Sequence, residues 1–292
     1  MSESVIADFV ATFNTEVSGD SEPVRGRILL SEKRLVLAAD PERTVTIALS
    51  SVFDVAVGHV PPDLGNFFDS TVTVAFETDE TRATAVIEAD DETIEKFSTV
   101  LFKALVNGTT VTVQHPARIG GRVTGEDFEP ATIAIEGHRL DIIREDDEFT
   151  IRLGTVSNFD RLTREIDGQS RPVIAVRHVS GGRAVTTLVA LPSGRLSNIL
   201  GRFIRLEYSD LVSEASDLDL SEDRIELLVT IYSTELDDPA ALARTLGTDG
   251  TRISMLLDDL DDDGVITYAD EAPALTPIGR VIVSRNLEVV NE

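Results

Sequence analysis

The sequence contains no cysteine, and bases are scarce relative to acids. The absence of cysteine excludes disulfides, thiolate metal sites and cysteine catalysis. Lys and Arg together number 26 against 52 Asp and Glu, which gives the 292-residue chain a formal net charge of −26. Such an excess of negative charge repels nucleic acid phosphates and anionic lipids over most of the surface. We therefore expect no nucleic acid partner.

Long apolar runs are also missing. The longest uncharged stretch, residues 104–117, is broken by Asn107 and Gly108 and is too short to span a membrane. The N-terminal segment MSESVIADFV carries acids where a signal peptide carries bases. We therefore expect a cytoplasmic protein without a membrane span. At roughly 100–200 residues per domain, the length predicts two or three domains.

Lysine is the rarest of the charged residues, since only Lys33, Lys96 and Lys103 are present. An acid-rich, lysine-poor chain suits concentrated salt, where screening weakens charge repulsion while carboxylates keep the surface hydrated. We therefore interpret most acidic runs as an adaptation to the solvent and not as the imprint of a partner.

An internal repeat relates two long segments in the first two thirds of the chain, residues 27–55 and 131–160. β-Branched residues in alternation predict antiparallel strands in both copies. Turn signals at residues 31–33, 40–42, 136–138 and at Gly181–Gly182 separate these strands. The matched positions are Arg34 and Leu35 with Arg139 and Leu140, then Ile47, Leu49 and Val52 with Ile151, Leu153 and Val156, then Val72, Val74 and Phe76 with Ile174, Val176 and His178.

Each copy ends in an amphipathic helix. The first is predicted over about 90–106, with Asp90 or Asp91 as N-cap and Asn107–Gly108 as its end, and the second over about 193–208. Asn107 also begins a glycosylation sequon, but without an export signal we interpret it as a helix cap. Short antiparallel strands closed by one helix are the layout of a pleckstrin-homology-like barrel, although a generic α+β sandwich explains the same pattern.

The last third of the chain changes to a helical period. After an acidic segment, helices are predicted from Ser221, from Asp238 as N-cap to Gly247, and over about 251–260. A hairpin follows Gly264, and a final helix begins after Thr276. Three helices, a hairpin and a final helix are typical of a winged helix.

The predicted fold class is therefore α+β: tandem pleckstrin-homology-like antiparallel β barrels, each closed by a C-terminal helix, followed by a winged-helix domain. The expected boundaries are 1–108 for the first β module, 109–208 for the second, 209–220 for an acidic linker and 221–292 for the winged helix.

A winged helix invites the hypothesis of a transcription regulator. Its third helix would need bases at the base edges of DNA. Residues 248–264 contain one base, Arg252, and six acids, and residues 221–292 contain five arginines and 16 acids, a net charge of −11. Because each phosphate contact needs a cation, we favour a winged helix that binds protein.

Residues 259–270 resemble the calcium loop of an EF-hand. Asp259, Asp261 and Asp263 have the spacing of calcium ligands, and Gly264 has that of the sharp turn. The last position departs from the pattern, because it holds Asp270 where a bidentate Glu is expected. We favour the interpretation as a helix end and a wing strand.

No catalytic constellation stands out. The four histidines have no paired metal-binding spacing, and the nucleophile-elbow, dinucleotide and P-loop signatures are absent. We therefore expect a protein that is not an enzyme, with no catalytic residues, no cofactor and no metal.

One cluster opposes the global charge. Arg25, Arg27, Lys33 and Arg34 lie within ten residues of sequence at the first predicted hairpin. These residues are the candidate partner-binding site, for an acidic protein partner or for a membrane that recruits the module. The alternative is ordinary surface charge that pairs with nearby acids such as Glu22, Glu32 and Glu42.

The stretch VRGRILLSEKRLVLAADPERTVTIALSSVFDV, the length, the acidic composition and the winged-helix-like end together resemble the CheF family of archaeal taxis proteins. The resemblance covers essentially the whole chain and is one of overall pattern. It implies an adaptor that links the phosphorylated response regulator CheY to the switch of the archaellum motor, without catalysis.

The same resemblance implies a set of partners: CheY, CheD, CheC-type proteins and the archaellum motor accessory proteins. It also implies a location in the cytoplasm at the motor base. The sequence does not say which module binds which partner, and the exposed edges of two β modules leave a homodimer open.

Overall fold

The structure is a computed structural model that describes residues 4–17, 22–61, 67, 69–79, 81–180, 183–234, 238–269 and 272–290. The predicted turn at Gly181–Gly182 and Asp270 of the calcium-loop pattern lie outside these residues. By internal contacts the chain divides into two compact units. The first comprises Met1–Thr110, Thr132–Gly137 and Leu191–Phe203, and the second comprises Val111–Ala131, His138–Ala190 and Ile204–Glu292.

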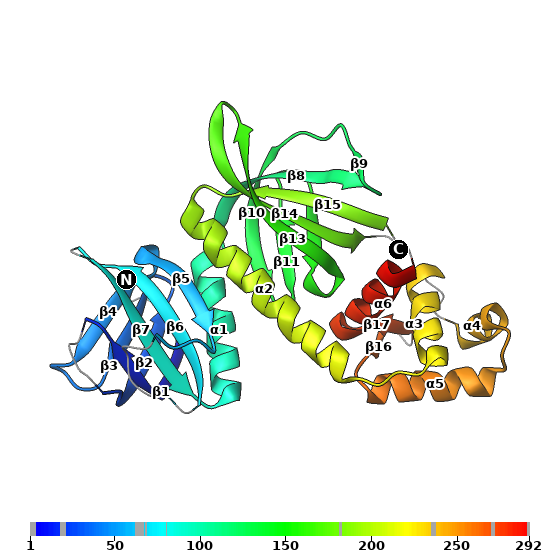
Figure 1. Ribbon diagram of the computed structural model, residues 1–292, viewed down its shortest axis with the longest axis horizontal. Coiled ribbons are helices and arrows are strands. Elements are labelled where there is room, and N and C mark those ends of the chain that lie inside the picture. The colour runs from blue at the N-terminus through cyan, green and yellow to red at the C-terminus, as the bar shows by residue number, and fades with distance from the viewer. Residues whose placement is uncertain are drawn as a thin grey trace. The chain divides into compact units, whose positions relative to one another are not determined.

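The first seven strands form one antiparallel sheet (Figure 1). In the third strand, Leu35 and Leu37 are fully buried while Arg34 is exposed, because successive side chains of a strand point to opposite faces. The order across the sheet is β4-β3-β2-β1-β7-β6-β5. The strands are β1 (Val5–Thr15), β2 (Val24–Ser31), β3 (Arg34–Ala38), β4 (Thr44–Ala48), β5 (Val52–Val57), β6 (Ser70–Glu77) and β7 (Arg82–Ala89).

The second sheet has the same order, strand for strand: β12-β11-β10-β8-β15-β14-β13, with β9 added beside β8. Val52 pairs with Phe76 in the first sheet and Val156 with His178 in the second, so the predicted repeat is confirmed in register. The strands are β8 (Thr109–Ile119), β9 (Arg122–Val123), β10 (Glu129–Glu136), β11 (Arg139–Ile143), β12 (Glu148–Arg152), β13 (Val156–Ile166), β14 (Gln169–Ser180) and β15 (Arg183–Ala190).

A short 3-10 helix follows the fourth strand of each copy, η1 (Leu49–Ser51) and η3 (Leu153–Thr155). The Leu49 N–H donates to the Lys33 carbonyl at 2.8 Å, and the Leu153 N–H donates to the His138 carbonyl at 2.9 Å. The repeat therefore extends to single backbone hydrogen bonds.

Helix α1 (Asp91–Val106) closes the first copy as predicted. The Asp90 carboxylate accepts from the Thr93 N–H at 2.9 Å and caps the start. At the end, Gly108 adopts a positive φ of 77°. The Asn107 side chain bonds both backbone groups of one residue of β10, Ile135. Its Oδ1 accepts from the Ile135 N–H at 2.7 Å, and its Nδ2 donates to the Ile135 carbonyl at 3.4 Å. The cap interpretation of Asn107 is confirmed.

Helix α2 (Gly194–Asp217) is longer than the predicted 193–208. It continues past Tyr208 because Leu211 and Ala215, four residues apart on one face of the helix, are buried, with exposed fractions of 3% and 7%. The predicted helix end was therefore wrong. Residues 194–203 belong to the first compact unit and residues 204–217 to the second.

The helical elements of the last third are those predicted. They are α3 (Glu222–Thr234), α4 (Pro239–Leu246), α5 (Gly250–Asp262), the hairpin β16 (Ile266–Ala269) and β17 (Ala272–Leu275), and α6 (Pro277–Val290). Asp238 caps α4, Gly247 ends it with a φ of 66°, and the Thr276 hydroxyl caps α6 through the Gly279 N–H at 3.2 Å. Together they enclose one apolar core that also includes Leu211 and Ala215 of α2.

The fold class is α+β, with two antiparallel sheets and helices. In each sheet as described, the pairing order is open, with β4 and β5 at the edges of the first and β12 and β13 at the edges of the second. The predicted closure into barrels is not among these pairings. Over the same residues, none of the helices combines the length and apolar character that a membrane span requires.

Candidate functional site

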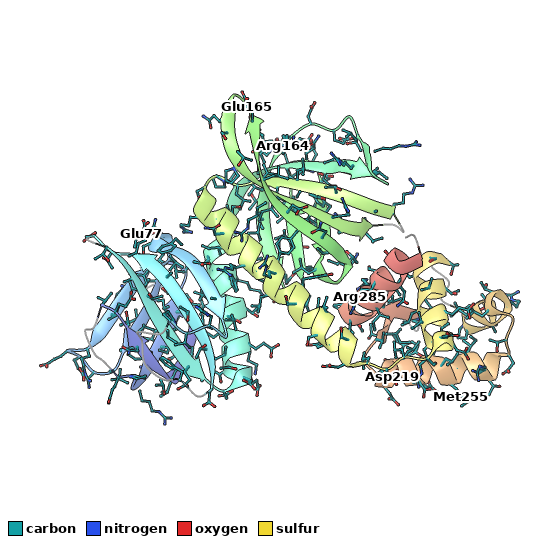
Figure 2. All side chains as sticks on the ribbon, in the orientation of Figure 1. Glu77, Arg164, Glu165, Asp219, Met255 and Arg285 are labelled. Carbon is teal, nitrogen blue, oxygen red and sulfur yellow. The ribbon has the colours of Figure 1, made fainter. Side chains whose placement is uncertain are left out.

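The second sheet carries a hollow of about 540 Å³, which we call the basic hollow. It is open to solvent and is formed by the outer face of β13, β14, β15 and β8 together with β9 and the segment after it. Figure 2 places Arg164 and Glu165 on the β13–β14 hairpin. The lining residues that matter here are Gln114, Arg118, Val123, Phe128, Asn158, Asp160, Leu162, Arg164, Glu165, Ala175, Arg177, Thr186 and Leu188.

Strand pairing explains how residues from distant parts of the sequence meet in the basic hollow. Asn158 pairs with Arg177, Arg177 with Thr186, and Thr186 with Arg118. These four side chains form one row across four strands, which we call the arginine row. Because neighbouring strands lie about 4.8 Å apart, the Cα atoms of Arg177 and Arg118 are roughly 10 Å apart.

An apolar floor lies beside the arginine row. Half-buried Leu162, Leu188 and Phe128 pack against the buried Ile166, Val173 and Ala190. This small cluster belongs to the outer face of the sheet, because Val173 pairs with Ala190 in β15 and with Leu162 in β13. At the far end of the floor, Arg164 pairs with Arg171, whose guanidinium donates to the Thr112 hydroxyl at 3.0 Å.

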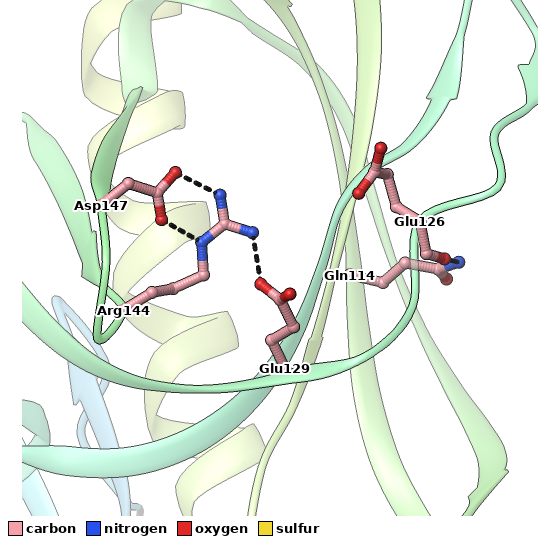
Figure 3. Close-up of polar contacts among 5 residues, drawn as sticks. All are labelled: Gln114, Glu126, Glu129, Arg144 and Asp147. Carbon is pink, nitrogen blue, oxygen red and sulfur yellow. Dashed lines mark hydrogen bonds and ion pairs between the residues drawn. The ribbon is translucent and has the colours of Figure 1, made fainter.

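One wall of the basic hollow is held by hydrogen bonds to backbone carbonyls. The Gln114 amide donates to the Glu126 carbonyl at 2.6 Å, a contact visible in Figure 3. The Thr124 N–H donates to the Ala117 carbonyl at 3.1 Å, and the Gly120 N–H donates to the Ala184 carbonyl at 2.8 Å. The segment is therefore tied to β8 at Thr124 and Glu126, and the turn before it is tied to β15 at Gly120.

Three arginines line the basic hollow: Arg118, Arg164 and Arg177. Among the described residues, no ion pair involves Arg118, Arg164 or Arg177. All three are exposed. In a chain of net charge −26, unpaired guanidinium groups around an apolar floor are free to bind carboxylates bidentately.

A second polar cluster of the second compact unit is structural. Arg144 donates to Asp147 through two bonds of 2.6 Å and to Glu129 at 2.9 Å (Figure 3). The hydrogen bond to Asp147 raises the pKa of Arg144 and lowers the pKa of the carboxyl. The Arg144 guanidinium also lies over the Phe149 ring, at 5.2 Å from its centroid.

The Phe149 ring continues into a histidine pair. It stacks on His115 with ring centroids 3.7 Å apart. His115 and His178 both hydrogen-bond the Thr187 hydroxyl, at 2.7 and 2.9 Å. Burial lowers the pKa of each histidine to about 4, with the Arg144 charge adding to the shift at His115. Both rings are therefore neutral near pH 7.

The four cations predicted as a partner site are split by the structure. Arg25 and Arg27 lie at the start of β2, and Lys33 and Arg34 lie at the β2–β3 turn, roughly 20 Å away along the strand. Arg27 binds the Asp8 carboxylate through bonds of 2.7 and 2.5 Å. Arg34 is anchored at the turn, where its N–H donates to the Ser31 hydroxyl at 3.2 Å. The four residues do not form one compact patch.

In the calcium-loop pattern, Asp259 and Asp261 lie in the last turn of α5, Asp263 is its C-cap, and residues 266–269 form β16. Asp259 and Asp263 accept from Arg224 at 2.6 and 3.0 Å. Over the part of the chain that the structure describes, no group of three or more potential ligands is arranged to hold a metal ion. Arg252, the one base of the predicted third helix, is engaged by Asp223.

Sequence reasoning missed the basic hollow because Arg118, Arg164 and Arg177 are scattered along the chain and each lies close to acids or apolar residues. One signal was present. In the repeat alignment, Arg177 falls on Ala75, so a base replaces a small residue at a matched strand position.

Comparison with known proteins gives the chain clear relatives. A family model described as "Archaeal Chemotaxis signal transduction system protein F" matches residues 5–210, which include both sheets. The chain is 48% identical over 291 residues to the "Taxis protein CheF2" of Halobacterium salinarum, covering 100% of both chains. It is 30% identical over 220 residues to the "Taxis protein CheF1" of the same organism, covering 73% of this chain and 71% of the relative.

Proposed function

The chain belongs to the archaeal CheF family of chemotaxis signal transduction proteins, and from this premise we propose that it is a taxis adaptor that links the response regulator CheY to the archaellum motor. The family is a taxis-signalling family and is not known as an enzyme family. The proposed mode of action is protein–protein binding without catalysis. CheD, CheC-type proteins and the archaellum motor accessory proteins complete the proposed set of partners, and the proposed location is the cytoplasm at the motor base.

The basic hollow is the observation that supports binding as the mode of action. Its arginines have no carboxylate partner among the described residues, and its apolar floor is half-buried. Basic and apolar groups held side by side on a sheet suit recognition of a protein surface.

The signal in this proposal is a difference in affinity between the two states of CheY. An adaptor that binds the phosphorylated form about 1.4 kcal/mol more tightly changes its occupancy about tenfold. No chemistry on the adaptor is needed, because phosphorylation happens on CheY.

The strand order and helix order also support our finer fold assignments. We propose that each sheet with its closing helix is a pleckstrin-homology-like module, and that residues 221–292 are a winged helix used for protein contact. The division into modules at residues 1–108, 109–208 and 221–292 remains part of this proposal.

A pull-down in molar salt tests the function. The purified full chain is immobilised and offered CheY with and without the phosphoryl mimic beryllofluoride. We expect retention of CheY that is at least tenfold stronger with the mimic. An absence of CheY binding in both states would overturn the adaptor proposal.

A further inference from the structure

The basic hollow combines arginines at both ends with an apolar floor between them, and this arrangement favours one kind of occupant. We propose that it binds an acidic segment of a partner protein in which carboxylates flank an apolar side chain. The inference rests on the proposed function in one respect, since that function identifies the partner as the response regulator.

The distribution of charge in the basic hollow is the first argument. The arginine row lies at one end and Arg164 at the other, with Leu162 and Leu188 of the apolar floor between them. Asn158 and Arg164 are six residues apart on β13, which corresponds to roughly 20 Å of extended strand. An extended segment of about six residues spans this length, with carboxylates at its ends and an apolar side chain on the floor.

The surrounding salt is the second argument. The composition predicts a protein of concentrated salt, where the Debye length falls to about 3 Å at 1 M. Open surface charges such as Arg25 then contribute little at a distance. Direct guanidinium–carboxylate contacts beside an apolar floor persist, because water and ions are excluded from them and because excluded salts strengthen apolar burial.

The lining itself argues against a phosphate polymer as the occupant. Asp160 and Glu165 line the same hollow, and Asp160 lies on β13 between Asn158 of the arginine row and Leu162. A chain of phosphates carries a charge at every unit and would meet Asp160, whereas the proposed segment carries carboxylates only at its ends. A nucleic acid would also leave Leu162 and Leu188 without a partner. A protein segment with mixed character satisfies both the cations and the floor.

The experiment compares two charge reversals of equal size in the full-length chain. The variant Arg118→Glu/Arg177→Glu reverses the arginine row, and the matched control Arg25→Glu/Lys33→Glu reverses two cations of the first sheet. Binding of CheY with beryllofluoride is measured by calorimetry in 2 M KCl. A third variant, Leu162→Gln, removes the apolar floor without changing charge and serves as an independent measurement if the double reversal does not fold.

We expect the arginine-row variant to weaken binding by about thirtyfold or more, since loss of one partner from a close charge pair costs about 2 kcal/mol or more. Leu162→Gln should weaken binding by about tenfold, and the control should stay within about threefold of the unmodified chain. If the unmodified chain binds CheY but neither the arginine-row variant nor Leu162→Gln weakens binding, the inference is overturned while the proposed function stands. If the unmodified chain does not bind CheY, the proposed function fails and the inference fails with it.

Discussion

The two sheets share one strand order and yet present different outer faces. In the first sheet, the row that matches the arginine row contains Asp54, Ala75 and Thr84. In the second sheet the same positions hold Asn158, Arg177 and Thr186. Asp54 is bound by Arg202 through two bonds of 3.1 Å, and the Thr84 hydroxyl donates to Glu16 at 2.9 Å. In this row the first sheet has one charged group, Asp54, and it is paired with Arg202, while over the described residues Arg177 and Arg118 of the second row have no ion pair.

Strand length gives the second face its hollow. β5 and β6 have 6 and 8 residues, whereas β13 and β14 have 11 and 12. The added length carries Arg164 and Ile166, which supply the far end of the basic hollow and part of the apolar floor. The two copies therefore share strand order and register, and they differ in the length of two strands and in a few side chains of the outer face. We infer that these differences make the second face the binding surface.

The largest expected effect concerns α2, which follows the second sheet but packs in part against α1 of the first copy. Phe203 of α2 is fully buried, and its ring packs on Phe102 of α1 with centroids 5.6 Å apart. Both residues belong to the first compact unit. We predict that Phe203→Ala lowers the free energy of unfolding of that unit by about 4 kcal/mol. Urea titration with hydrogen exchange over β1–β7 measures it.

The matched control for this change is Phe128→Ala, which removes an aromatic ring from the second compact unit. We expect it to leave the exchange protection of β1–β7 unchanged. Equal protection of β1–β7 in the Phe203→Ala variant and the unmodified chain would contradict the prediction.

The second prediction introduces the middle residue of η1 at the matched position of η3. Ser50 occupies the middle of η1 and Gly154 the middle of η3. A Cβ atom on Gly154 would lie 2.5 Å from the Pro277 carbonyl oxygen, which is too close for van der Waals contact. We predict that Gly154→Ser destabilises the second compact unit by about 2 kcal/mol, detected as lost exchange protection in α6. Gly194→Ser, where the added Cβ meets no atom within 4 Å, is the control.

The third prediction concerns acid stability, in which the two sheets should differ because His178 stands where the first sheet has Phe76. The folded state holds the pKa of His178 near 4, below the usual 6.5. An unfolded chain therefore takes up the proton first, so this stability is complete above about pH 6.5 and is lost as the pH falls through about 4.

Urea midpoints at pH 7 and pH 5, in one salt concentration, test this expectation. The decrease between the two pH values should be smaller in His178→Phe than in the unmodified chain, since the carboxylates and His115 are common to both proteins. His178→Gln provides the same comparison if the larger ring is not accepted. An identical decrease in every variant would show that His178 does not set the acid sensitivity.

The smallest expected effect sharpens the difference between the two faces. Gln114 ties the wall of the basic hollow to β8, and Asn14, at the matched position of the first sheet, accepts from the Thr15 N–H beside it. We predict that Gln114→Ala costs about 1 kcal/mol or less and raises hydrogen exchange of residues 124–128. The same substitution at exposed Gln169 should leave those residues unchanged. No change in exchange at 124–128 would mean that the other bonds suffice to hold the wall.

Much of the fold follows from the sequence because its signals are local. The match of Phe76 to His178 followed from alternation and proved correct in register. Asp238 and Gly247 marked the ends of α4 because caps depend on the nearest backbone groups. The length of α2 was missed, because acidic and other polar residues surround Leu211 and Ala215 in the sequence, and the spacing of these two residues alone gives only a weak helical signal. The basic hollow was missed because Arg118 and Arg177 meet through pairing of strands that are far apart in sequence.

The hydrogen bonds of Asn107 have a consequence for the chemical ageing of the protein. An asparagine followed by glycine deamidates readily when its side chain swings towards the next backbone nitrogen, and asparagine is among the thermolabile residues. Here the amide of Asn107 is held by both backbone groups of Ile135. The Asn107 side chain should therefore deamidate slowly in folded molecules and quickly in unfolded ones. Deamidation at this one position would record how long each molecule has spent unfolded.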